Sequence, residues 1–251
     1  MKLKKIFKKG SFAASILIFF FIAGCKDKST NPVISTNMDD AADVVAAALG
    51  DGNSTSGVAS GISDAIDVSK GNTLSTFSLK KISKAMFDTT IVRIKSVGSY
   101  SYNYTFNFQY SFVTANSLSF SYTMKGVYDA PNLSSADSAN AAWTVSGILP
   151  AATQYKVNGL YIRDGSEASK VRNKNSLNTK LELTLKDISA SKETGKILGG
   201  TADGSLNGSD TNGDTFSYIV NVVFNGDQTA TITVNEQTYN VNLTKGQVDP
   251  Q

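Results

Sequence analysis

The chain has 251 residues, no histidine and a single cysteine, and its 24 basic and 21 acidic residues give a formal net charge of +3. The absence of histidine excludes the commonest general base, the Ser-His and Cys-His nucleophile pairs, and histidine metal sites. The single cysteine excludes an intramolecular disulfide.

The first 24 residues have the pattern of a bacterial export signal. The opening ten residues contain five lysines and no acidic residue, and residues 11–24 are apolar without a single charge. That run is shorter than the roughly 20 apolar residues that a membrane-spanning helix needs. It therefore predicts a cleaved signal peptide over residues 1–24 rather than a permanent transmembrane helix.

The apolar run ends in Ile22-Ala23-Gly24-Cys25, an aliphatic residue and two small residues before the cysteine. This motif resembles the lipobox of bacterial lipoprotein precursors. The resemblance covers only the first tenth of the chain and implies lipidation of Cys25 by several acyl chains, which hold a protein at a membrane far better than one. Lys26 stands where inner-membrane lipoproteins resemble one another in carrying aspartate, which implies the outer membrane of the cell envelope. Residues 26–251 resemble no family.

Loss of the signal peptide changes the charge balance. Removal of its five lysines from the 24 basic residues leaves 19 against 21 acidic residues, a net charge of −2. This balance argues against a nucleic-acid partner, because backbone binding needs a concentrated basic surface. Residues 25–37 are polar and without periodicity, which predicts a flexible tether that spans roughly 20 Å.

A small helical region is expected next, over residues 38–70. Residues 38–49 are rich in alanine, carry three aspartates in the first turns and precede Gly50 at the C-cap position. Residues 58–68 place their apolar side chains on one helical face, which indicates a second, weaker helix. These helices need an apolar surface to cover, so we expect them to form a cap.

Residues 71–245 have the pattern of an antiparallel β domain. Every even position from Tyr100 to Phe112 is aromatic and the odd positions are polar. This alternation places seven rings on one face of a strand. A turn at residues 114–117 leads into a second alternating strand, so the two form a hairpin. Further alternating runs occupy residues 155–161, 177–185, 216–224, 230–234 and 239–243.

Glycine turns are expected between the strands. We count nine or ten strands in a mainly β, antiparallel meander that closes into a barrel or a curved half-barrel, with a sandwich as a third arrangement. Residues 246–251 form a polar tail. The predicted turns are Asp164-Gly165, Thr194-Gly195, Asn212-Gly213 and Asn225-Gly226.

The aromatic strand is the first candidate site. Cross-strand ring pairs stabilise a sheet core, and the same rings could line a cavity for an apolar ligand. The candidate ligand-binding residues are Tyr102, Tyr104, Phe106, Phe108 and Tyr110.

A basic edge is the second candidate site. Arg163, Lys170, Arg172 and Lys174 could contact an anionic partner, although charges at a hairpin end commonly serve only to solvate it or to guard a strand edge. The segment Asp210–Asp214 has oxygen ligands in calcium-loop order but lacks the loop's glycine and bidentate glutamate. We therefore predict no metal, no cofactor and no catalytic residue.

These features predict a non-catalytic binding or structural module, anchored to the envelope membrane by lipid, with an envelope protein or an apolar ligand as its partner. One alternative is a carrier or sensor that holds an apolar or amphipathic ligand inside the curved sheet. Another is an integral outer-membrane β-barrel whose aromatic face meets lipid.

Overall fold

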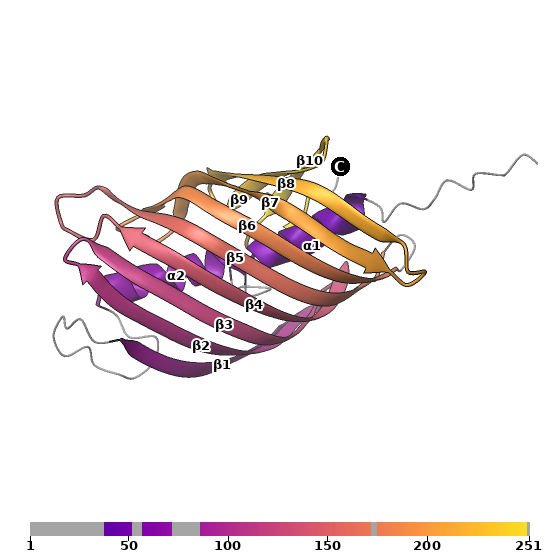
Figure 1. Cartoon of the computed structure of the whole chain (residues 1–251), viewed down its shortest axis with the longest axis horizontal. Coiled ribbons are helices and arrows are strands. Elements are labelled where there is room, and N and C mark those ends of the chain that lie inside the picture. The colour runs from indigo at the N-terminus through magenta and orange to yellow at the C-terminus, as the bar shows by residue number, and fades with distance from the viewer. Residues whose placement is uncertain (1–37, 52–56, 72–85, 172–174, 250–251) are drawn as a thin grey trace, which may run out of the picture. The chain divides into compact units, whose positions relative to one another are not determined.

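The computed structural model describes residues 38–51, 57–71, 86–171 and 175–249. In these ranges it contains two helices, α1 (Met38–Leu49) and α2 (Val58–Ser69), and one large sheet (Figure 1). Both predicted helices are confirmed, and α2 extends one residue beyond its expected end. Neither described helix is long and apolar enough to cross a membrane. The predicted signal peptide, Cys25 and the tether lie outside the described residues.

The sheet contains eleven strands, and each pairs antiparallel with the next strand along the chain. This order confirms the predicted meander, with at least one more strand than we counted. The strands are β1 (Phe87–Val97), β2 (Tyr100–Thr114), β3 (Ser117–Asp129), β4 (Leu133–Ser146), β5 (Gln154–Ser169), β6 (Ser176–Ser191), β7 (Ile197–Asp210), β8 (Thr215–Gly226), β9 (Thr229–Val234), β10 (Gln237–Asn242) and β11 (Gln247–Val248).

Two of the four predicted glycine turns, Thr194-Gly195 and Asn212-Gly213, lie between strands, and Asn225-Gly226 forms the end of β8 directly before a turn. In the turn that follows Asn225-Gly226, Asp227 and Gln228 both have positive φ values, 49° and 61°. Two consecutive left-handed residues are typical of a tight hairpin turn. The turn predicted at Asp164-Gly165 is wrong, because both residues lie inside β5 and pair with β4.

The sheet curves around the helices. α1 contacts β5 and also β9, β10 and β11, although β5 and β9 would lie roughly 19 Å apart in a flat sheet. A helix about 10 Å across reaches both only if the sheet bends around it. Tyr100 Oη, at the start of β2, donates a 2.7 Å hydrogen bond to Gln247 Oε1 of β11. No strand pairing joins β1 to β11 in the described ranges, so the sheet is a curved half-barrel rather than a closed barrel.

The first helix is tied to the last strands by hydrogen bonds. Tyr239 Oη on β10 donates to Asp39 Oδ1 on α1 over 2.8 Å, between residues that are 200 positions apart. Just after α1, the backbone N–H of Asp51 donates to the Leu243 carbonyl over 3.0 Å. The two ends of the described chain therefore stabilise each other.

The side of the sheet that faces the helices is apolar, and the opposite side is polar. Along β2, buried and exposed residues alternate from Tyr102 to Tyr110. The same alternation runs through β4, β6 and β8. The apolar face and the buried sides of α1 and α2 form a single core.

Candidate functional site

Five rings on β2, β3 and β4 form a continuous surface on the helix-facing side. Neighbouring ring centroids lie 5.3 to 6.2 Å apart, within the range at which aromatic pairs attract each other. Every one of these rings is buried. We call this surface the aromatic wall; it consists of Phe106, Phe108, Phe120, Tyr122 and Trp143.

The structure brings the five predicted ligand-binding rings together on this side of β2. Each is at most 9% exposed. Phe106 and Phe108 belong to the aromatic wall, and Tyr104 joins a buried ionic cluster further along the strand. The strand's alternation alone positions all five rings, and their role in ligand binding stays a prediction. The five residues are Tyr102, Tyr104, Phe106, Phe108 and Tyr110.

Helix α2 lies directly on the aromatic wall because of Gly61. A Cβ atom added at Gly61 would lie 2.7 Å from Trp143 Cη2 and 2.7 Å from Tyr122 Cε1. Glycine weakens a helix by about 1 kcal/mol relative to alanine, and here it permits a contact that no side chain would allow. α2 therefore fills the space in front of the rings.

A bidentate ion pair connects α2 to the first strand. Arg93 on β1 donates to both carboxylate oxygens of Asp64 on α2, over 2.7 and 3.0 Å. The Arg93 guanidinium carbon also lies 5.0 Å from the centroid of Phe106, in cation–π geometry. Burial raises the pKa of Asp64, and Arg93 offsets this effect only in part. The pair links the edge of the sheet to the helix above the aromatic wall.

A second ionic group is fully buried between β4 and β5. Arg163 Nη2 donates to Asp137 Oδ2 over 2.6 Å, and Arg163 Nη1 lies 3.3 Å from Glu167 Oε1. The two carboxylate side chains are completely buried and the arginine side chain is 3% exposed. One guanidinium is therefore shared between two carboxylates away from water.

Three hydroxyl groups donate hydrogen bonds to this site, while Asp137 Oδ1 and Arg163 Nη1 have no hydrogen-bond partner among the described residues. Ser135 Oγ and Tyr104 Oη donate to Asp137 Oδ2 over 2.7 and 3.1 Å, and Thr179 Oγ1 donates to Glu167 Oε2 over 2.9 Å. Hydrogen bonds of this kind are what allows a charge to stay buried. The donors lie on β2, β4 and β6, so the site joins these three strands to β5. We call it the Arg163 cluster; it consists of Tyr104, Ser135, Asp137, Arg163, Glu167 and Thr179.

Gly165 makes the Arg163 cluster possible. A Cβ atom at Gly165 would lie 2.0 Å from Glu167 Oε1, so any side chain there would displace the carboxylate from Arg163. The Asp-Gly pair that suggested a turn lies instead inside a long strand. Gly165 faces inward there, and its missing side chain leaves room for the Glu167 carboxylate. The signal was present in the sequence, because Arg163 and Glu167 share the inward parity of Tyr161.

Burial dominates the electrostatics of the Arg163 cluster. It raises the pKa of Glu167, which the charge of Arg163 and the hydrogen bond from Thr179 lower only in part. Burial lowers the pKa of Arg163, but Asp137 and Glu167 overcome this effect and the pKa is raised. The two carboxylates therefore favour the charged form of Arg163 in spite of its burial.

The raised pKa of Glu167 predicts a pH-dependent contribution to stability. Between the ordinary glutamate pKa of about 4.3 and its higher value in the fold, the folded state binds more protons than the unfolded state, so this group loses stabilisation as the pH rises. Glu167→Gln abolishes the effect. Urea unfolding should therefore show the stability of the variant, relative to wild type, increasing from pH 4 to pH 7. Glu182→Gln, at a half-exposed site on β6, is the matched control, and an equal trend in both variants would refute this assignment.

The predicted basic edge is not assembled as expected. Arg163 is buried in its ion pairs and is not available to a partner at the surface. Lys170 lies at the surface and forms an ion pair with Asp129. Arg172 and Lys174 lie outside the described residues. The expectation treated Arg163 as a surface charge, whereas the alternation of β5 turns it inward.

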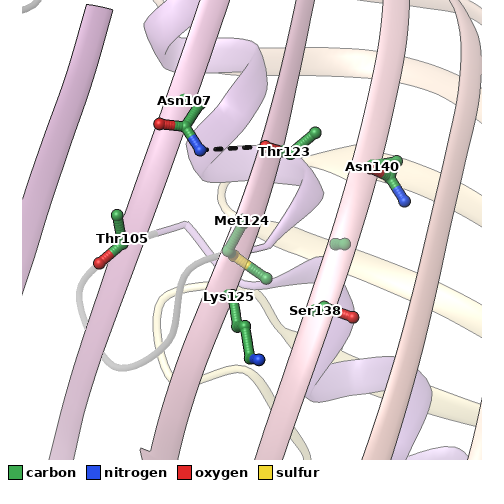
Figure 2. Close-up of a pocket in the computed structure, with 8 residues that line it drawn as sticks. Thr105, Asn107, Thr123, Met124, Lys125, Ser138 and Asn140 are labelled. Carbon is green, nitrogen blue, oxygen red and sulfur yellow. Dashed lines mark hydrogen bonds between the residues drawn. The ribbon is translucent and has the colours of Figure 1, made fainter.

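The polar side of the sheet carries a shallow hollow over β2, β3 and β4. Figure 2 shows Thr105, Asn107, Thr123, Ser138 and Asn140 around it, on the side of the strands away from the helices. Its volume is about 510 Å³. Asn107 Nδ2 donates to Thr123 Oγ1 over 3.4 Å. Part of the hydrogen-bonding capacity of the hollow is therefore already used between the strands.

The turn with calcium-like spacing folds around Asp210. Its Oδ1 atom accepts hydrogen bonds from the backbone N–H groups of Asn212 and Asp214, over 2.8 and 3.0 Å. This is an aspartate-stabilised hairpin turn. In the described part of the chain, no group of three or more acidic residues could hold a metal ion.

The chemistry of the site is thus an apolar wall beside a buried, hydrogen-bonded ionic cluster. Asp137 and Glu167 are closed off from solvent and already accept hydrogen bonds, so the arrangement fits a cross-link between strands better than proton transfer to a substrate. Comparison with known proteins finds no matching family model, no matching curated protein and no matching solved structure.

Proposed function

We propose that the chain is a non-catalytic binding or structural module that a lipid at Cys25 anchors to the cell envelope. The observation that carries the proposal is the sequence of residues 1–25, in which a lysine-rich start, an uncharged apolar run and the motif Ile22–Cys25 follow one another. Lys26, in place of an aspartate, favours the outer membrane.

The contents of the half-barrel support a binding or structural module over an enzyme. The chain has no histidine, and the carboxylates of the Arg163 cluster are buried and paired. The helix-facing side holds rings and helices in close contact. A filled interior of this kind stabilises the fold, which leaves the outer surfaces of the module to bind a partner.

A carrier of an apolar ligand is the second candidate. It is favoured by two buried polar groups beside the aromatic wall, Trp143 Nε1 and Tyr161 Oη, for which the described residues supply no hydrogen-bond partner. A buried donor nearly always has an acceptor in a folded protein. These groups could donate hydrogen bonds to a bound ligand.

Metabolic labelling tests the anchor. The full chain is expressed in a bacterium that has an outer membrane, in the presence of radiolabelled palmitate. We expect the wild-type protein to carry label and to sediment with the outer membrane. Cys25→Ser should carry no label and retain its signal peptide, because the variant lacks the thiol that is acylated.

Lys26→Asp is the matched control. It should be labelled like wild type but sediment with the inner membrane. Label on Cys25→Ser would refute the lipidation of Cys25, and outer-membrane sedimentation of Lys26→Asp would refute the role of Lys26 in sorting.

A further inference from the structure

Two aromatic residues on the helix-facing side of β4 and β5 carry hydrogen-bond donors that have no acceptor among the described residues. Trp143 is 3% exposed and Tyr161 is fully buried, and neither Trp143 Nε1 nor Tyr161 Oη has a hydrogen-bond partner among the described residues. Buried donors of this kind call for an explanation, such as an ordered water or a ligand. Their chemistry requires an acceptor oxygen between the strands and the helices.

The two residues that carry these donors lie near each other in the sheet, and Trp143 lies against α2. Tyr161 pairs with Ala141, two residues before Trp143 on the same face of β4. Trp143 belongs to the aromatic wall and lies directly beneath Gly61 of α2. An acceptor that reaches both donors would therefore adjoin an apolar surface of five rings, which is the arrangement that an amphiphile needs.

We infer that the aromatic wall binds the acyl chain of an uncharged amphiphile in place of α2, with the Trp143 and Tyr161 donors bonded to a carbonyl oxygen of its head group. The inference rests on the proposed binding function and names the ligand class. An ester or amide carbonyl accepts two hydrogen bonds, as the two donors require.

The charge of the neighbouring cluster selects against an anionic head group. One positive charge, on Arg163, already faces two carboxylates, Asp137 and Glu167. An additional carboxylate or phosphate would meet this negative excess in a region of low dielectric constant, where like charges repel strongly. A neutral carbonyl avoids that cost.

Helix α2 occupies the position of the ligand in this structure. Its buried side chains, among them Ile62, Ala65 and Ile66, cover the sheet as an acyl chain would. Its described polar ties to the sheet converge on Arg93, through Asp64 and Ser60. Exchange of α2 for an acyl chain therefore replaces one apolar surface with another and requires the Arg93–Asp64 pair to open.

Photo-crosslinking tests the inference on the full, lipid-anchored protein in phosphatidylcholine nanodiscs. The probe is a monoacylglycerol with a diazirine on its acyl chain, and the comparison probe is the fatty acid of the same chain length. After irradiation, mass spectrometry locates the modified residues. We expect the monoacylglycerol to modify the aromatic wall and the fatty acid to modify it markedly less.

Two variants sharpen the test. Tyr161→Phe removes one donor and should reduce labelling of the wall about fivefold to tenfold, the value of one hydrogen bond, without loss of thermal stability. Asp64→Asn breaks the ion pair with Arg93 and should increase labelling. Asp67→Asn, three residues further along α2, is the matched control and should label like wild type.

Other outcomes overturn the inference. Labelling that avoids the aromatic wall would exclude the site, equal labelling by both probes would exclude selection for a neutral head group, and unchanged labelling of Tyr161→Phe would exclude its donor role. Unchanged labelling of Asp64→Asn would show that α2 does not open. Recovery of the protein in nanodiscs through Cys25 is read from the same sample, so a failed crosslink is distinguishable from a failed anchor.

Discussion

Arg163→Met is expected to lower the free energy of unfolding by about 3–5 kcal/mol, the usual cost of removing one partner from a buried ion pair. The substitution keeps most of the side-chain volume but leaves Asp137 and Glu167 buried without their cation. The two carboxylates then repel each other, and one of them must bind a proton. Equilibrium urea unfolding at pH 7 measures the loss.

Lys170→Met is the matched control for this prediction. Lys170 also pairs with an aspartate, Asp129, but that pair is exposed to solvent. Exposed ion pairs contribute about 0–1 kcal/mol, so the control should unfold nearly like wild type. Equal losses in the two variants would show that the Arg163 cluster is not the buried cross-link described above.

Phe108→Ala should also lower the free energy of unfolding by about 3–5 kcal/mol, because it removes a large ring from a packed core. Phe108 is completely buried. Its ring contacts those of Phe106, Phe120 and Tyr122 at centroid distances of 5.3 to 5.8 Å. Arg93 lies over its face as well. Thermal or urea unfolding of the protein gives the result.

Phe216→Ala on β8 provides the comparison. Phe216 is only partly buried, and its one described ring contact is with Tyr218. The variant should lose much less stability than Phe108→Ala. A similar loss at both positions would contradict the central place of the aromatic wall in the core.

Alternation in the sequence predicted the sheet and the face that each ring occupies. The strict pattern from Tyr100 to Phe112 yields β2, its buried side and its hairpin with β3. β4 and β7 were harder to see, because the inward side of β4 includes Ser135, Asp137 and two alanines, and the inward side of β7 is mostly glycine and alanine. Small residues leave little hydrophobic contrast between the two faces.

The Arg163 cluster was missed for a different reason. Arg163 was grouped with the basic residues that follow it along the chain, although its odd position places it on the same face as Tyr161. The partner Asp137 lies on a strand that the alternation did not predict, and the contact of Gly61 with Trp143 joins residues 82 positions apart. Long-range contacts of this kind depend on the curvature of the whole sheet, which no local pattern encodes.

The bond between Asp39 and Tyr239 also constrains the order of folding. Each strand pairs with its neighbour in sequence, so hairpins can form early, as soon as each pair of strands is available. α1 is synthesised first among the described elements but contacts β9, β10 and β11, so its apolar face must wait for the last strands. Loss of the C-terminal hairpin would thus leave the N-terminal helix with only its contacts to β5 and α2, and part of its apolar face would be uncovered.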